Sequence, residues 1–316
     1  MLRSTFIYLS RLRWAQSLIT RLPPARAMAG RFVAGDTLAE AMAVTERLNR
    51  RGLNVSLDLL GESVTNAGEA ARAADEYLRA LEAIGASQAR ANISVKLTQM
   101  GLDLGPEVCL PNVRRVVEKA RAVGAFVRVD MEGTPYTDRT LAMVRQLRLG
   151  FENVGVVLQA YLYRTEQDLL GLAAEHTRVR LCKGAYQEPP DKAFPRKRDV
   201  DANYLKLARL LLDYAARAAL ADPAGRVPPL CALATHDERM IADAQRYASD
   251  HAMSRQAFEF QMLYGIRPGL QEQLASAGYA VRVYVPYGTH WYPYFMRRLA
   301  ERPANVWFFL SNFFRK

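Results

Sequence analysis

Short apolar segments alternate with longer amphipathic segments along most of this chain. The short segments are rich in Val, Ile and Leu, which is typical of strands buried in a parallel sheet. The longer segments repeat apolar residues at intervals of three and four, which predicts helices with one buried face. In the first of them Leu38, Ala41, Thr45 and Leu48 share a side, and Gly52 follows where helices often end.

This alternation predicts eight strands with helices between them. The expected strands cover Asn54–Glu62, Asn92–Thr98, Ala125–Glu132, Val154–Tyr161, Val179–Tyr186, Cys231–His236, Phe258–Met262 and Ala280–Tyr284. The expected helices include Thr37–Arg51, Val64–Ile84, Pro106–Val123, Asp138–Leu149, Glu166–Glu175, Ala202–Leu220, Glu238–Ser249 and Tyr294–Glu301. Such a series predicts a (βα)8 TIM-type barrel. A doubly wound open sheet would use fewer strands and a glycine-rich first turn, which is absent.

The composition fits one globular domain. The chain has 316 residues, of which 50% are apolar and 24% charged, enough to bury a large core. Its three cysteines, Cys109, Cys182 and Cys231, are far apart and form no CxxC pair. That usage favours a reducing compartment and argues against a structural metal site. No apolar run reaches transmembrane length.

The net charge of +11 is spread along the chain, but the first stretch is entirely basic. Six arginines precede the first acidic residue, Asp36; they are Arg3, Arg11, Arg13, Arg21, Arg26 and Arg31. A transit peptide, an amphipathic helix on anionic lipid and a nucleic-acid arm all show such a composition. We expect residues 1–36 to form a basic helical arm packed on a barrel of residues 37–316. No nucleic-acid-binding motif accompanies the charge, so no nucleic-acid partner is expected.

Polar residues lie at or just past the C-terminal end of most predicted strands. They are Asp58, Glu62, Lys96, Asp130, Glu132, Gln159, Arg164, Arg180, Lys183, Thr235, His236, Gln261 and Tyr284. Each one alone is also explained as a salt-bridged strand end. As a set they indicate a ligand site, because barrels bind ligands at that rim and unpaired buried charges are costly. His236 fits a hydrogen-bonded strand end as well as a ligand contact, and no nearby histidine gives it metal-ligand spacing, so no metal is expected.

The end of the predicted barrel carries a distinct cluster of side chains. We expect a turn at Pro286 and Gly288, followed by a helix. On that helix four polar residues fall at offsets of three and four and so share one face: Tyr294, Arg297, Arg298 and Glu301. Two adjacent guanidiniums suit a small carboxylate. The alternative is a solvated helix face with an ordinary ion pair.

Other rim residues extend this hypothesis. Lys96 is a third cation that can converge on the same carboxylate, with Asp130 as its partner. The remaining rim groups are too numerous for a small substrate and indicate a second, larger ligand that carries phosphates. Gly184 would let the backbone approach such a ligand closely.

With these residues identified, the chain resembles the proline dehydrogenases, flavin-dependent enzymes that begin proline breakdown. The similar motifs lie between Asn54 and Asn305. They are Asp58-Leu-Leu-Gly-Glu62, Ser94-Val-Lys-Leu97, Asp130-Met-Glu132, Gln159-Ala-Tyr161, Lys183-Gly-Ala-Tyr186, Ala234-Thr-His236, Phe258-Glu-Phe-Gln-Met-Leu263, Tyr284-Val-Pro-Tyr-Gly288 and Tyr294-Phe-Met-Arg-Arg-Leu-Ala-Glu301. The resemblance implies a distorted (βα)8 barrel that binds FAD. It also implies oxidation of L-proline to 1-pyrroline-5-carboxylate, with hydride passing from the ring carbon next to nitrogen to flavin N5.

The resemblance also implies roles for individual residues. The implied catalytic residues are Lys96, Asp130, Arg180, Tyr284, Arg297 and Arg298. The implied substrate contacts are the cations Lys96, Arg297 and Arg298 and the ring walls Leu181, Tyr186, Tyr284 and Tyr294. The implied cofactor contacts are Asp130, Met131, Gln159, Arg180, Lys183, Gly184, Ala185, Thr235, His236, Gln261 and Glu301. The bulk of Tyr284 over the ring should favour proline over hydroxyproline, and Arg180 should stabilise the negative charge of a reduced flavin.

Further expectations concern partners and location. The resemblance implies a membrane quinone as electron acceptor. The chain is too short to include the aldehyde dehydrogenase fused to some relatives, so a separate pyrroline-5-carboxylate dehydrogenase is expected downstream. A cytoplasmic location follows, with peripheral contact at the inner face of a bacterial membrane through the basic arm. Two other hypotheses are a barrel aldolase that forms a Schiff base at Lys96 or Lys183, and a non-catalytic basic module that binds lipid.

Overall fold

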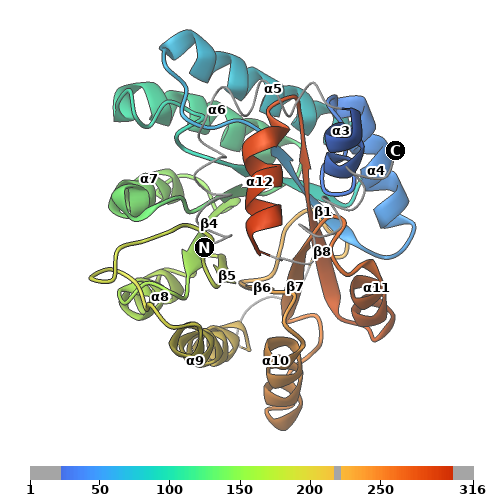
Figure 1. The fold of residues 1–316 in the computed structure, drawn as a ribbon, viewed down its shortest axis with the longest axis vertical. Helices are drawn as coiled ribbons and strands as arrows, with labels where there is room; N and C mark the ends of the chain where they lie inside the picture. Colours follow the sequence, from blue (N-terminus) through green and yellow to red (C-terminus); the bar gives the residue numbers. More distant parts are fainter. Residues whose placement is uncertain (1–22, 217–221, 302–316) are drawn as a thin grey trace.

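The computed structural model describes residues 23–216 and 222–301. Its eight strands form a closed barrel in chain order (Figure 1), and each strand is parallel to both neighbours. They are β1 (Asn54–Leu59), β2 (Ala91–Val95), β3 (Val127–Val129), β4 (Val154–Gln159), β5 (Val179–Cys182), β6 (Cys231–Ala234), β7 (Phe258–Leu263) and β8 (Ala280–Tyr287). The predicted (βα)8 barrel is therefore confirmed.

Helices surround the barrel, and one of them departs from the ring. They are α3 (Pro23–Ala29), α4 (Leu38–Asn49), α5 (Ala67–Gly85), α6 (Pro106–Ala122), α7 (Thr137–Arg148), α8 (Thr165–Ala174), α9 (Lys197–Ala215), α10 (Glu238–Asp250), α11 (Pro268–Ser276) and α12 (Trp291–Glu301), with a short 3-10 turn at Thr134–Tyr136. Figure 1 shows α5 to α11 around the outside and α12 lying across the centre of the barrel. The last helix thus covers the barrel instead of extending its wall.

Several predicted boundaries were wrong, among them the start of α9 and the end of β8. Helix α9 begins at Lys197 rather than Ala202, because the charged residues before 202 form its exposed first turn instead of a loop. Strand β8 does not turn at Pro286 but continues to Tyr287. It pairs with β7 only as far as Tyr284, whereas its pairing with β1 continues to Tyr287. Pro286 therefore lies where one neighbouring strand has ended, a position where its missing N–H costs little.

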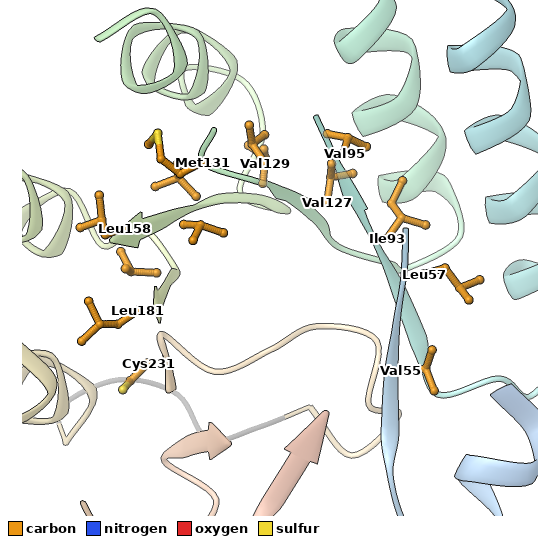
Figure 2. Packing of buried hydrophobic residues seen from close by; sticks show 14 of the residues in the cluster. Val55, Leu57, Ile93, Val95, Val127, Val129, Met131, Leu158, Leu181 and Cys231 are labelled. Carbon is orange, nitrogen blue, oxygen red and sulfur yellow. The ribbon is translucent and has the colours of Figure 1, made fainter. Parts of the chain in front are cut away.

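The strands direct apolar side chains outward and polar side chains inward. In β1 the apolar residues Val55 and Leu57 pack toward the helices, while Ser56 faces the interior and bonds Ser94 Oγ at 3.1 Å. Figure 2 shows the outer layer, including Leu181 of β5. Each fully buried Leu or Val of this layer contributes about 1.5–3 kcal/mol through removal from water. Most TIM barrels instead fill the interior with branched apolar residues, so this polar interior requires internal partners.

A smaller apolar cluster joins the N-terminal segment to α12. Phe32 and Val33, just after α3, are buried with Tyr292 and Phe295 of α12. The Ala34 N–H donates to the Pro286 carbonyl at 2.8 Å, which ties the same segment to β8. Residues 23–36 of the expected arm therefore pack against α12. Residues 1–22 of that arm lie outside the described part of the chain.

Near the opposite, N-terminal ends of the strands, one arginine binds four backbone carbonyls. The guanidinium of Arg226 donates to the carbonyls of Ile84 (2.9 Å), Ser87 (2.7 Å), Ala89 (3.1 Å) and Val123 (3.0 Å). These carbonyls lie at or after the C-terminal ends of α5 and α6, where the helix dipole favours a cation. Arg226 thus joins two helices to the loop that precedes β6.

Arg226→Met should lower the free energy of unfolding by about 2–4 kcal/mol, because four carbonyls lose a charged donor together. Urea unfolding followed by circular dichroism measures the loss. Arg239→Met is the matched control, since that side chain is exposed on α10. Equal stability of the two variants would contradict this role for Arg226.

Candidate active site

A cavity of about 600 Å³ lies at the C-terminal ends of the strands, beneath α12. Its size is that of a site for a small organic ligand or cofactor. Seventeen residues expected from the sequence line it: Asp58, Lys96, Asp130, Met131, Gln159, Arg180, Lys183, Gly184, Ala185, Tyr186, Thr235, His236, Gln261, Tyr284, Tyr294, Arg297 and Arg298. The rim pattern therefore identified a real cavity.

The ammonium of Lys96 is held mainly by Asp58, not by the expected Asp130. Lys96 Nζ lies 2.7 Å from Asp58 Oδ1 and 3.9 Å from Asp130 Oδ2, and Asp58 is fully buried. Burial acts to lower the pKa of Lys96, but the two carboxylates outweigh that effect and leave the pKa above its ordinary value. Burial raises the pKa of Asp58. Lys96 is therefore a fixed cation, which argues against a neutral Schiff-base amine at this position.

Asp130 connects a second cation to a phenol. It accepts from Arg180 Nη1 at 2.8 Å and from the Tyr284 hydroxyl at 2.7 Å. The guanidinium carbon of Arg180 also lies 5.3 Å from the centre of the Tyr284 ring, within cation–π range. Burial, together with the charge of Asp130, holds the pKa of Tyr284 well above its ordinary value. The Tyr284 hydroxyl therefore keeps its proton and acts as a donor.

Lys183 is paired instead of being a free cation for phosphates. Its ammonium lies 2.6 Å from Asp201 of α9 and 2.8 Å from Asp237, the residue before α10. Asp201 also pairs with Lys197. The lysine thus ties β5 to two helices, and a ligand at this corner meets a cation already shared between two carboxylates.

Gln159, at the end of β4, and His236, just after β6, are oriented by hydrogen bonds to backbone groups. Gln159 Nε2 donates to the carbonyls of Met131 and Glu132, both at 3.3 Å, and its buried Oε1 has no hydrogen-bond partner among the described residues. His236 Nε2 accepts the Leu263 N–H at 2.9 Å, so a neutral ring carries its proton on Nδ1. Gln159 Oε1 can therefore accept a hydrogen bond from a ligand, and His236 Nδ1 can donate one.

Helix α12 brings its arginines to the cavity on the predicted face. Arg297 Nη2 lies 2.6 Å from Glu62, which follows β1 and holds this guanidinium. Arg298 is buried, and its guanidinium carbon lies 5.0 Å from the centre of the Tyr294 ring. Glu301 ends α12, and its side chain lies outside the described part of the chain.

The order and identity of these groups agree with sequence comparison. The sequence matches the family profile described as proline dehydrogenase over residues 41–310. The chain belongs to the proline dehydrogenase family. This confirms the resemblance inferred from the motifs.

Individual relatives cover most of the chain. Proline dehydrogenase 1 of Bacillus subtilis (strain 168) is 41% identical over 323 residues, with 100% of both chains covered. The proline dehydrogenase of Deinococcus radiodurans is 41% identical over 290 residues, which cover 90% of this chain and 89% of that one. Among solved structures, proline utilization A from Bdellovibrio bacteriovorus matches with a TM-score of 0.77 and 26% identity, over 88% of this chain and 33% of that longer chain.

One residue that the resemblance to proline dehydrogenases placed at the substrate does not reach the cavity. Leu181 is fully buried in the apolar layer outside the strands, because its neighbour Arg180 occupies the inward position of β5. Leu263, at the end of β7, lines the cavity instead. Tyr186 and Tyr294 line it as expected.

Sequence reasoning missed several other lining residues, among them Cys182 and Asp237. Asp58 was expected at this rim, but its role as the main partner of Lys96, from the adjacent strand β1, was not. Burial raises the pKa of the Cys182 thiol to about 11, so this cysteine lines the cavity as a neutral thiol and not as a nucleophile. No cluster of three metal-ligating side chains occurs within residues 23–216 and 222–301.

Gly184→Ala should lower the free energy of unfolding by about 1–3 kcal/mol, because it adds strain at a left-handed backbone position. Gly184 has a φ of 110°, and a Cβ there would lie 2.5 Å from the ring of Tyr161. Thermal unfolding measures the effect. Gly150→Ala is the control, since a Cβ at Gly150 has no atom within 4 Å, and an equal loss in both variants would contradict the prediction.

Proposed function

We propose that this member of the proline dehydrogenase family oxidises L-proline to 1-pyrroline-5-carboxylate with bound FAD. The observation that carries the proposal is the convergence of Lys96, Arg297 and Arg298 on one cavity that also contains Arg180 and Asp130. Cations held by buried or partly buried carboxylates form a pre-organised receptor for an anion. The carboxylate of a small amino acid supplies the negative charge that these cations can bind.

The proposed substrate contacts follow from charge and shape. Lys96, Arg297 and Arg298 bind the proline carboxylate, and the last two also close the site from α12. Tyr186, Tyr284 and Tyr294 contact the pyrrolidine ring, together with Leu263 instead of the expected Leu181. The Tyr284 hydroxyl is held by Asp130 at 2.7 Å, so the phenol side chain cannot rotate away from a substituted proline ring. This supports a preference for proline over hydroxyproline.

The residues of the cavity fit a flavin, and we propose FAD. An isoalloxazine offers ring N–H and carbonyl groups, and the cavity supplies an unpaired buried acceptor at Gln159 together with donors at Arg180 and His236. Met131, Thr235 and Gln261 complete the proposed ring contacts. Gly184 and Ala185 allow close approach of the backbone, and Lys183 and Glu301 are the proposed contacts farther along the cofactor.

The chemistry is divided between the cofactor and the protein. When bound, FAD supplies two-electron oxidation by taking a hydride from the ring carbon next to the proline nitrogen. The protein orients that carbon by holding the carboxylate and the ring. The substrate amine must first lose a proton to solvent, so turnover should rise with pH. Arg180, oriented by Asp130, stabilises negative charge that develops beside it.

We further propose that electrons leave to a membrane quinone and that a separate pyrroline-5-carboxylate dehydrogenase consumes the product. Full-length agreement with Proline dehydrogenase 1 of B. subtilis supports an enzyme of this one reaction. None of the helices in residues 23–216 and 222–301 has the length and hydropathy needed to cross a membrane. A cytoplasmic location with lipid contact through the basic arm, residues 1–36, stays a prediction from composition.

A visible absorption spectrum tests the proposed function. The purified protein, supplemented with FAD if necessary, should show flavin bands that bleach on anaerobic addition of L-proline. A soluble quinone analogue should then restore the bands. Absence of bound flavin, or bands that ignore proline, would overturn the proposal.

Arg297→Met should raise KM for proline about 10- to 100-fold with little change in kcat, because a charged hydrogen bond to the substrate carboxylate is lost. Steady-state kinetics with equal flavin content measures it. Arg115→Met is the control, since Arg115 forms a surface ion pair with Asp75 at 2.7 Å, away from the cavity. An unchanged KM in Arg297→Met would contradict a contact with the carboxylate.

A further inference from the structure

A buried carboxylate lies one layer below the cavity and is not part of its lining. Glu259 of β7 is fully buried, as is Arg282 of β8, and Arg282 Nε donates to both carboxylate oxygens at 3.0 and 3.2 Å. Arg282 Nη1 in turn donates to the carbonyls of Val55 at 2.9 Å and Gly225 at 3.0 Å. Through Arg282, Glu259 is therefore connected to the backbone of β1 and of the loop before β6.

Glu259 also reaches toward the cavity through Gln261, two residues along the same strand. The Gln261 amide donates from Nε2 to Glu259 Oε1 and accepts at Oε1 from Arg180 Nε. These two contacts require opposite ends of one amide. A flipped amide would place its NH2 group against the guanidinium and its oxygen against the carboxylate, so the negative charge of Glu259 selects a single orientation.

Arg180 is consequently held from three directions. Besides Gln261, it donates from Nη1 to Asp130 at 2.8 Å and from Nη2 to Ser94 at 3.0 Å. Its orientation therefore depends on a continuous series of contacts from Arg282 through Glu259 and Gln261. Glu259 also lies among further buried positive charge, because Arg128, Arg180 and Arg282 interact electrostatically in the same interior.

We propose that Glu259 is a positioning residue, which fixes the Gln261 amide and through it the Arg180 guanidinium that faces the flavin. This inference rests on the proposed function, because it concerns the proposed contact between Arg180 and the cofactor. Glu259 itself touches neither substrate nor cofactor. It sets how firmly a cation is held where negative charge develops on reduction.

The test is Glu259→Gln in the flavin-loaded full chain, with the midpoint reduction potential as the main measurement. A displaced Arg180 stabilises the reduced flavin less, so the potential should become more negative. Loss of the Glu259 charge alone, with Arg180 in place, would shift the potential in the opposite direction, because removing an anion favours added electrons. The sign of the shift therefore separates positioning from a simple field effect.

Kinetics give a second measurement. We expect kcat to fall about 10-fold while KM for proline stays within about 3-fold, because the substrate cations are untouched. Asp243→Asn is the matched control: Asp243 is likewise a buried carboxylate with two arginine partners, Arg209 at 2.6 Å and Arg246 at 2.7 Å, but it lies on α10 outside the barrel. Its potential and kcat should match those of the unmodified protein.

A double-mutant cycle tests the route through Gln261. In a Gln261→Met background, Glu259→Gln should no longer make the potential more negative, because the connecting amide is gone and only the loss of the Glu259 charge remains. Additive shifts would overturn the proposal, as would an unchanged or more positive potential in the single variant. If Glu259→Gln does not fold, Glu259→Asp keeps the charge but shortens the reach, and the same negative shift is expected; no shift would again overturn it. Failure of the unmodified protein to bleach with proline would instead overturn the proposed function.

Discussion

The structure depends on the neutralisation of charge that is buried inside the barrel. An isolated ammonium or carboxylate in such an interior costs several kcal/mol, and the cost falls only when partners are close and well oriented. Lys96 with Asp58, Arg180 with Asp130, and Arg282 with Glu259 meet that requirement at 2.7 to 3.0 Å. Because each pair joins different strands, the charges that prepare the cavity also fix the strands that form it.

The pleat of the strands makes this arrangement compatible with a large apolar core. Hydrophobic side chains face the helices, so the core lies between the sheet and the helical ring while the interior carries the polar groups. Helix α12 then completes the cavity. One face of it packs against Phe32 and Val33, and another brings Arg297 and Arg298 to the cavity. The helix that bears the arginines is thus positioned by the segment at the start of the described chain.

Much of this was accessible from the sequence, because periodicity identifies strands and the barrel rule places ligands at their C-terminal ends. The partners of the rim residues were not accessible in the same way. The lysine at 96 was assigned to Asp130, yet Asp58 is its nearer partner, and nothing in the sequence indicated that Glu62 holds Arg297. Asp58 reaches Lys96 from β1, the strand that pairs directly with β2, whereas Glu62 reaches Arg297 only because the closed barrel pairs β1 with β8. Leu181 was expected to line the cavity, but successive residues of a strand face opposite sides. Because Arg180 faces the interior of the barrel, Leu181 faces the helices.

The alternation of polar and apolar residues has a consequence for folding fidelity. A slip of one residue in the pairing of β1 with β2 would exchange the two faces of the strand. Asp58 would then enter the apolar layer beside the helices, Leu57 would enter the charged interior, and Lys96 would lose its closest partner. In a barrel with an apolar interior the same slip would cost far less, since both faces could accept a hydrophobic side chain. The charges that serve the cavity therefore also discriminate between correct and shifted strand registers while the chain folds.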